Sequence, residues 1–273
     1  MKAQLIDGKQ ISAEIKAEAA EEAAALKAKG ITPCLAVVLV GDDSASQVYV
    51  NNKKKACEAV GIRSVSHVLS GGTTEEALLE LIAKLNADKD IHGILVQMPV
   101  PKQIDERKVI LAIDPKKDVD CFHPVNVGNL HTGGEGFLPC TPAGIIELIK
   151  RSGHSIEGKQ CVVIGRSNIV GKPVAMLLMQ ENGTVTICHS KTKNLAEICR
   201  GADIIVSAVG KVNTVTADMV KEGAILIDVG MNRNEAGKLC GDVDFENVKE
   251  IAGAITPVPG GVGPMTIAML MKN

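Results

Sequence analysis

Aromatic side chains are nearly absent from this sequence. Its 273 residues include one Tyr, three Phe and no Trp, although 45% of the chain is hydrophobic. The core must therefore be built mainly from Val, Ile, Leu, Ala and Met, and the hydrophobic fraction is large enough to bury such a core. A pocket that stacks an aromatic ring on its ligand has few candidates, and Tyr49 is the single tyrosine.

An excess of charge of either sign is also missing. The 30 basic and 32 acidic residues give a formal net charge of -2, so no broad positive field is available to bind nucleic acid or an anionic membrane. No window approaches the roughly 20 apolar residues of a membrane span, and Met1 leads into a polar stretch rather than a signal peptide. We therefore expect a soluble, cytoplasmic protein whose partners are small molecules, with no nucleic acid or membrane among them.

The cysteines show no pattern of a metal site. No pair of them has the C-x-x-C spacing, and no histidine lies at a spacing typical of a metal ligand. In an intracellular chain of this size, cysteines are expected to stay reduced, and several of them to pack as small apolar residues. We expect eight free thiols, at positions 34, 57, 121, 140, 161, 188, 199 and 240.

Short apolar runs alternate with helical patterns along most of the chain. Continuous apolar strands separated by helices indicate parallel sheets covered on both faces, so the predicted fold class is α/β with two doubly wound domains. The segment 114–142, rich in Gly, Pro, His and Asp, interrupts the alternation and is predicted to be a loop and domain junction. The first series has strands at 35–40, 65–69 and 93–97, and helices at 8–30, 46–60, 74–85 and 105–113. The second has strands at 162–164, 185–188, 204–208 and 225–228, and helices at 142–151, 171–181 and 194–199.

A glycine-containing turn joins the first strand of the second series to its helix. Gly165 permits a tight turn, Gly171 permits close approach of the backbone to a ligand, and Pro173 fits the first turn of a helix. Backbone N–H groups and the helix N-terminus could bind a pyrophosphate there. The spacing is neither G-x-G-x-x-G nor a Walker A loop, since Pro173 replaces the Ser or Thr that would hold magnesium, so phosphoryl transfer is not expected. A turn that binds nothing is the alternative.

The end of the next strand indicates which dinucleotide would bind. NAD enzymes usually have Asp or Glu at this place to bind the ribose 2′-hydroxyl, and segment 188–193 contains neither. Ser190 can donate to a 2′-phosphate, and Arg166 or Lys191 can neutralise it, which favours NADP. The alternative is that Lys191 and Lys193 are ordinary surface lysines.

Candidate catalytic side chains lie in the first series. Tyr49 and Lys53 are four residues apart on a predicted helix, so they share one face, although a lysine on a helix is usually only solvated. Gln97 follows a strand at the carboxyl edge of a parallel sheet, where binding crevices form. Asp118 and Asp120 could suggest a metal pair, but no Glu or His completes such a site, so no metal is expected.

Six segments, in order over nearly the whole chain, resemble the family of bifunctional methylenetetrahydrofolate dehydrogenase/cyclohydrolases. Any one of these motifs would be only suggestive, whereas six in register are highly specific. The segments are 49–55 (YVNNKKK), 93–99 (GILVQMP), 117–124 (KDVDCFHP), 140–142 (CTP), 163–173 (VIGRSNIVGKP) and 256–266 (TPVPGGVGPMT).

The resemblance implies oxidation of 5,10-methylenetetrahydrofolate with NADP, hydrolysis of the methenyl product to 10-formyltetrahydrofolate, and a homodimer. It implies a folate-binding catalytic domain over 1–139, completed by a final helix at 265–273, and a Rossmann-like NADP domain over 140–264. Lys53 is implied to be the cyclohydrolase residue, with Tyr49 and Gln97 as its catalytic neighbours, and Gln97 is expected to hydrogen-bond Lys53. The implied substrate-binding residues are Tyr49, Pro99, Asp120 and Gly261, and the implied cofactor-binding residues are Thr141, Gly165, Arg166, Ser167, Gly171, Ser190, Lys191 and Val229.

The sequence departs from this family at two places. Cys121 stands where the family usually has Gly, and the chain ends at Asn273, inside what the family implies to be a longer final helix.

Two alternatives to this family remain. A two-domain oxidoreductase like shikimate dehydrogenase would leave the segment 259–264 (PGGVGP) unexplained. A non-catalytic NADP-binding sensor would not need Tyr49, Lys53, Gln97 and Asp120 together.

Overall fold

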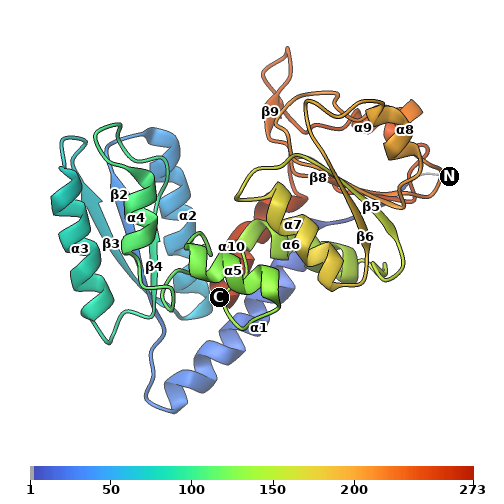
Figure 1. Cartoon of the computed structure of the whole chain (residues 1–273). Helices are drawn as coiled ribbons and strands as arrows, with labels where there is room; N and C mark the ends of the chain where they lie inside the picture. Colours follow the sequence, from blue (N-terminus) through green and yellow to red (C-terminus); the bar gives the residue numbers. More distant parts are fainter. Residues whose placement is uncertain (1–2) are drawn as a thin grey trace. The chain divides into compact units, whose positions relative to one another are not determined.

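The computed structural model describes residues 3–273, which form two units (Figure 1). The three-strand unit contains Glu14–Leu138 and Leu270–Asn273. The six-strand unit contains Pro139–Met269 together with the chain up to Ala13. Each unit is named after its main sheet, and in both sheets every pair of neighbouring strands is parallel. This arrangement confirms the predicted α/β fold with two parallel-sheet domains.

The sheet of the three-strand unit has the order β3-β2-β4. From β2 the chain crosses to β3 on one side, and from β3 it crosses back over β2 to β4. Because such crossovers are right-handed, the two connecting helices fall on opposite faces of the sheet, as Figure 1 shows for α2 and α3. The elements are β2 (Cys34–Val40), α2 (Ser44–Val60), β3 (Arg63–Leu69), α3 (Glu75–Ala87), β4 (Gly93–Val96), α4 (Glu106–Ala112) and α5 (Pro124–Thr132).

Capping residues explain where the helices of this unit begin and end. The side chain of Asp43 accepts a hydrogen bond of 2.7 Å from the backbone N–H of Ser46 at the start of α2. Thr74 does the same for Ala77 in α3, at 3.2 Å. At the end of α2, Gly61 adopts a left-handed conformation, with φ 79°, that favours glycine. These short-range signals are why the helices predicted at 46–60 and 74–85 appear at nearly those positions.

The sheet of the six-strand unit has the order β1-β11-β8-β7-β5-β6. The chain leaves β5 for the edge strand β6 and then returns across β5 to β7. The direction of winding therefore reverses between β5 and β7, and ligands of such sheets bind beyond the carboxyl ends of the strands at this point. The strands are β1 (Gln4–Leu5), β5 (Gln160–Ile164), β6 (Thr184–Cys188), β7 (Ile204–Ser207), β8 (Ile225–Asp228) and β11 (Ala254–Ile255), and β9 (Asn232–Arg233) and β10 (Leu239–Cys240) form a separate antiparallel pair.

Helices cover both faces of this larger sheet. One face is covered by α8 (Leu195–Arg200), the short 3-10 turn η1 (Ala217–Met219) and α9 (Phe245–Val248), whose apolar side chains share a core cluster with the strands. On α6 (Cys140–Arg151) and α7 (Gly171–Gln180), which contact each other, most side chains are buried. The helices α1 (Gly8–Ala28) and α10 (Val262–Lys272) carry the chain from one unit into the other. In the described part of the chain, no helix combines the length and the apolar character needed to cross a membrane.

The observed division differs from the expected boundaries at 1–139, 140–264 and 265–273. The chain up to Ala13 belongs to the six-strand unit, because β1 pairs with β11 and the Ser12 hydroxyl donates to the Pro264 carbonyl at 3.1 Å. Of the final helix, only Leu270–Asn273 belong to the three-strand unit. A two-residue strand such as β1 has no periodicity of its own, so its partner was not visible in the sequence.

The segment predicted as a loop contains the helix α5. His123 caps this helix by accepting a hydrogen bond of 3.2 Å from the Val125 backbone, and Pro124 occupies its first turn. Proline at the first helical position is a known start signal, which the prediction of a loop at 114–142 overlooked. All eight cysteines are free thiols, as predicted.

Two charged side chains hold the loop between α4 and α5. The Lys117 ammonium donates to three backbone carbonyls at the end of α3, at 2.7 to 3.0 Å, which satisfies acceptors that a helix end leaves open. Asp118 is 3% exposed and accepts from the backbone N–H of Phe122 and His123 and from the amide of Asn126, at 2.8 to 3.2 Å. The loop is therefore fixed before any ligand binds.

Cys121 lies in this loop with a backbone conformation typical of glycine. Its φ is 59°, in the left-handed region, and its side chain is 1% exposed. Burial raises the pKa of the thiol to about 12, so it stays protonated and unreactive near neutral pH. The position thus has a physical reason to accept glycine, and the cysteine here bears a conformational cost of about 1–2 kcal/mol.

We expect glycine to be tolerated better than alanine at this buried position. Cys121→Gly relieves the left-handed strain, which offsets the lost side chain and the greater entropy of the unfolded chain, so the free energy of unfolding should change by less than about 1 kcal/mol. Cys121→Ala keeps the strain and loses the sulfur, so it should be less stable by about 1 kcal/mol or more. Urea unfolding of the two variants checks this order, and an alanine variant more stable than the glycine variant would contradict it.

Candidate functional site

Lys53 and Gln97 meet at the carboxyl edge of the three-strand sheet. The Lys53 ammonium donates to Gln97 Oε1 at 2.9 Å, which confirms the hydrogen bond expected from the sequence. Gln97 directly follows β4, and its Nε2 donates to the Met98 carbonyl at 2.8 Å. Because the amide nitrogen is held in this way, the amide oxygen is the group that faces Lys53. The lysine is thus oriented by a residue that the sheet itself positions.

The single tyrosine lies one helical turn before this lysine. Tyr49 and Lys53 are both on α2, and Tyr49 is 45% exposed. A ring with this exposure can cover the face of a flat ligand. Pro99 follows on the loop after β4 and is joined to Met98 by a cis peptide bond. These residues place an aromatic ring, an ammonium group and an amide at one edge of the sheet.

Asp120 adds a carboxylate to this edge. Burial raises the pKa of Asp120, the positive charge of Lys53 lowers it and the neighbouring carboxylate of Asp118 raises it, with a net result of about 6. Asp118 accepts hydrogen bonds within the loop, whereas Asp120 is subject to the field of Lys53, so two aspartates two residues apart have different surroundings. From the sequence, Asp118 is a candidate only for a metal pair, but its hydrogen bonds to residues four, five and eight positions later show that it shapes the loop.

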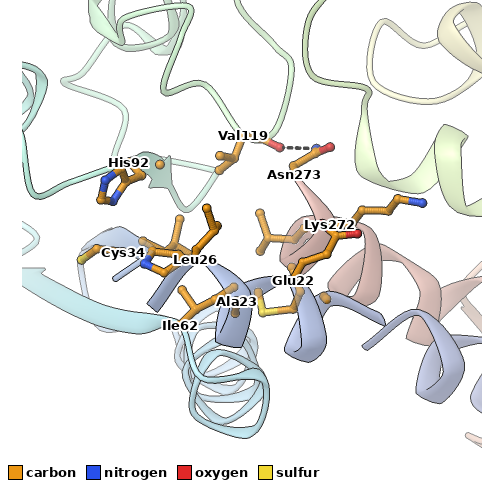
Figure 2. A pocket seen from close by; sticks show the side chains of 15 residues that line it. Glu22, Ala23, Leu26, Cys34, Ile62, His92, Val119, Lys272 and Asn273 are labelled. Atoms are coloured by element: carbon orange, nitrogen blue, oxygen red, sulfur yellow. Dashed lines mark hydrogen bonds between the residues drawn. The ribbon is translucent and has the colours of Figure 1, made fainter. Parts of the chain in front are cut away.

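A separate pocket lies at the amino-terminal edge of the same sheet (Figure 2). It has a volume of about 140 Å³ and is lined by α1, by the starts of β2 and β4 and by the last residues of the chain. The Asn273 amide donates to the Val119 carbonyl at 2.9 Å beside it. None of the expected site residues lines this pocket, so it is distinct from the edge that carries Lys53 and Gln97.

The six-strand unit carries the expected cofactor turn between β5 and α7. Gly165 has φ 126°, and a Cβ on it would lie 2.4 Å from the Ala208 carbonyl oxygen. A Cβ on Gly171 would lie 2.4 Å from the Gly165 carbonyl oxygen. The hydroxyl of Ser167 accepts from the backbone N–H groups of Val170 and Gly171, both at 3.2 Å, and thereby shapes the turn. Only glycine fits at the two positions, and the helix N-terminus they expose is suited to an anion.

The residues expected to select the dinucleotide follow the neighbouring strand. Since β6 pairs with β5, the exposed side chains of Ser190 and Lys191 lie at the same sheet edge as the Gly165 turn and the exposed Arg166. The backbone N–H of Lys191 donates to His189 Nδ1 at 3.1 Å, which holds this short loop. Segment 189–193 offers no carboxylate to a ribose hydroxyl.

The remaining expected residues lie elsewhere in the six-strand unit. The hydroxyls of Thr141, in the first turn of α6, and Thr266 are 2.8 Å apart. Val229 follows β8, and its N–H donates to the Ser207 carbonyl at 2.9 Å. Gly261, expected to bind substrate, also belongs to this unit, where a Cβ on it would lie 2.6 Å from the Pro257 carbonyl oxygen. The structure therefore groups Tyr49, Lys53, Gln97, Pro99 and Asp120 in one unit and Gly261 and the eight expected cofactor residues in the other.

Family models match both units. The model for "Tetrahydrofolate dehydrogenase/cyclohydrolase, catalytic domain" matches residues 6–120, and the corresponding "NAD(P)-binding domain" matches residues 139–273. A shikimate dehydrogenase from Aquifex aeolicus is 16% identical with a TM-score of 0.52, a likeness of fold alone, so this alternative is not favoured.

Relatives match over nearly their full length. The "Bifunctional protein FolD" of Agathobacter rectalis is 62% identical over 99% of this chain and 97% of its own. The crystal structure of the bifunctional FolD dehydrogenase/cyclohydrolase from Campylobacter jejuni is 54% identical, with a TM-score of 0.96 over 99% of this chain and 96% of its own. The enzyme of Trypanosoma brucei, solved with NADP and an inhibitor, is 42% identical, with a TM-score of 0.93 over 100% and 96%. The chain therefore belongs to the tetrahydrofolate dehydrogenase/cyclohydrolase family.

Proposed function

We propose that this protein oxidises 5,10-methylenetetrahydrofolate to 5,10-methenyltetrahydrofolate with NADP and hydrolyses the product to 10-formyltetrahydrofolate. Membership of the family supports both activities. The observation that carries the proposal is the hydrogen bond of 2.9 Å between Lys53 and Gln97, at the edge of the sheet where the carboxylate of Asp120 also lies. An ammonium, an amide and a carboxylate at one sheet edge suit a ligand that has both a polar heterocycle and a carbon to be hydrolysed.

The folate is held by residues of the three-strand unit. The carboxylate of Asp120 can accept two hydrogen bonds from the amino-pyrimidine edge of the pterin, and the ring of Tyr49 can stack on the folate. Pro99, on the loop after β4, completes the proposed substrate-binding residues of this unit. With the ligand oriented in this way, hydride transfer requires positioning rather than a protein acid.

The cofactor is held by the six-strand unit. NADP supplies the acceptor of the hydride, and the close approach allowed at Gly165 and Gly171 fits its pyrophosphate. Arg166, Ser190 and Lys191 would hold the 2′-phosphate by charge and hydrogen bonding, and the relative from Trypanosoma brucei was solved with NADP. Ser167, Thr141 and Val229 complete the proposed cofactor-binding set.

Hydrolysis requires proton transfer, which we assign to Lys53. Water adds to the methenyl carbon, the bond from this carbon to N5 breaks, one water proton ends on N5 and the other is released. Lys53, in its neutral form, can take the proton from the attacking water and return a proton to N5. Gln97 accepts a hydrogen bond from Lys53 and so keeps its nitrogen in place, and Tyr49 lies on the same face of α2.

We also propose that the protein acts as a homodimer in the cytoplasm. The family supports the dimer. The edge strand β6 supports it as well, since it leaves one side of the sheet unpaired and exposes Ile187, and Met179 on α7 is also exposed.

The two activities should separate in a Lys53→Met variant. Methionine keeps much of the apolar stem but removes the amine, so the cyclohydrolase rate should fall by about 10²- to 10⁴-fold while dehydrogenase activity stays measurable. Separate optical assays of reduced cofactor and of the methenyl chromophore measure the two steps. Lys54→Met, an exposed lysine next in sequence, is the matched control and should leave both rates unchanged. Hydrolysis by the Lys53 variant at near the parent rate would show that this assignment is wrong.

NADP should be preferred over NAD, and the preference should shrink in Arg166→Ala and Ser190→Ala. Each change removes a group that can contact the 2′-phosphate of NADP. NAD lacks this phosphate, so its binding should be little affected. The ratio of kcat/KM for the two cofactors is the measurement. Lys159→Ala, an exposed lysine just before the amino-terminal end of β5, should leave the ratio unchanged. Equal kcat/KM values in the unaltered protein would refute the preference.

Folate binding should weaken as the pH falls through about 6. The pKa of Asp120 is raised to about 6, so above this pH the carboxylate predominates and can accept the two pterin hydrogen bonds, and below it the neutral acid predominates. The KM for methylenetetrahydrofolate should therefore rise between pH 7 and pH 5, about two units above where an ordinary aspartate titrates. In Asp120→Asn the KM should be high throughout and lack this step. A constant KM over this range in the unaltered protein would rule out the raised pKa.

A further inference from the structure

The carboxylate of Asp242, in the segment after β10, lies at the carboxyl edge of the six-strand sheet. Asp242 is 0% exposed. Its Oδ2 accepts from the Ser207 hydroxyl at 3.1 Å and from the backbone N–H of Val209 and Gly210 at 2.9 and 3.3 Å. Its Oδ1 accepts from the backbone N–H of Lys211 at 2.9 Å and from the Asn232 amide at 3.0 Å. Three consecutive N–H groups of the loop after β7 thus converge on one buried side chain.

A second buried carboxylate fixes the position of Asp242. Asp228, at the end of β8 and 3% exposed, accepts from the backbone N–H of Asp242 at 2.8 Å and of Val243 at 2.9 Å. A Cβ on Gly241 would lie 1.8 Å from Asp228 Oδ2, and one on Gly230 would lie 2.2 Å from Asp242 Oδ1. The two carboxylates therefore fit only because glycine lies against each of them.

The loop held by Asp242 lies where the second half of a dinucleotide must reach. The strand order places β6, β5, β7 and β8 side by side. Ser190 and Lys191, proposed for the 2′-phosphate, follow β6, and the pyrophosphate turn with Arg166 follows β5. A dinucleotide that continues along this edge brings its other nucleoside to the ends of β7 and β8. The segment 209–211 follows β7 there. The preceding residue, Ala208, lies against the Gly165 turn, since a Cβ on Gly165 would lie 2.4 Å from the Ala208 carbonyl oxygen.

The exposed side of this loop is suited to a flat heterocycle. Val209 and Val212 are 41% and 37% exposed, while the backbone N–H groups of the loop are directed to Asp242. The apolar side chains are therefore available to a ligand, and the three backbone N–H groups already have an acceptor. Without the carboxylate, three N–H groups would lose their acceptor and the loop would lose this conformation.

We propose that Asp242 is a positioning residue that holds the loop 209–211 in the conformation that binds the nicotinamide nucleoside of the cofactor. It touches neither substrate nor cofactor, and it acts through the loop. This role rests on the proposed function, because it concerns the binding of NADP. The Gly165 turn holds the pyrophosphate, and the loop 209–211 would hold the nicotinamide nucleoside. Replacing Asp242 should therefore weaken binding of the nicotinamide half of the cofactor and leave binding of the adenosine half unchanged.

Binding of a whole and a partial cofactor separates this role from a general structural one. NADPH contains both nucleosides, whereas 2′,5′-ADP contains only the adenosine half with its 2′-phosphate. In Asp242→Asn, which replaces an acceptor oxygen by a donor, the Kd for NADPH should rise by about tenfold or more, and the Kd for 2′,5′-ADP should stay within about twofold. The cyclohydrolase rate, measured with methenyltetrahydrofolate and no cofactor, should be unchanged because its proposed residue Lys53 lies in the other unit.

Two further variants test whether the effect is specific to the carboxylate of Asp242. Asp244→Asn makes the same chemical change two residues away, at a side chain that accepts from Asn247 at 2.7 Å, and should change neither Kd. If Asp242→Asn does not fold, Ser207→Ala removes one donor to the same carboxylate and should weaken NADPH binding selectively but less. Equal weakening of NADPH and 2′,5′-ADP, or unchanged NADPH binding, would overturn the inference. Failure of the unaltered protein to bind either compound would instead overturn the proposed NADP function, and this inference with it.

Discussion

Buried aspartates that accept backbone N–H groups hold the loops at the carboxyl edges of both sheets. Asp118 does so in the three-strand unit, and Asp228 and Asp242 do so in the six-strand unit. Removing a carboxylate from water is unfavourable, and several charge-assisted hydrogen bonds to each group offset this cost. The loops that follow parallel strands have no ladder of hydrogen bonds of their own. Their conformation, and with it the arrangement of the site residues, depends on these side chains.

The two aspartates of one loop show how surroundings decide a role. The donors around Asp118 are all groups of the loop and of α5, so its charge is used within the fold. Asp120 is half-buried, and the charge that favours its ionised form is that of Lys53, on the helix α2. The pKa of Asp120 is raised to about 6, close to neutral pH. A ligand that donates two hydrogen bonds to Asp120 can stabilise its ionised form. A structural carboxylate and a ligand-binding carboxylate can therefore be neighbours in sequence.

Glycine has a defined steric role where backbone meets backbone or carboxylate. Gly165 and Gly171 bring the turn after β5 close to its neighbours, and Gly230 and Gly241 make room for the two buried aspartates. Position 121 has a left-handed backbone conformation that favours glycine, but a cysteine occupies it. Its buried thiol is chemically inert because its pKa is raised to about 12.

The sequence by itself determined the features that depend on neighbours in the chain. Apolar runs predicted the strands β2 to β8, and helical patterns predicted most helices. The spacing of Tyr49 and Lys53 placed them on one helix face, and the turn at Gly165 indicated a dinucleotide. Tertiary structure alone decided which unit the first residues join and which carboxylates hold which loops. The strand β1 pairs with a strand about 250 residues away, and Asp242 accepts from Ser207, 35 positions earlier. Hydrogen bonds of this kind depend on the packing of distant strands, and no local pattern encodes them.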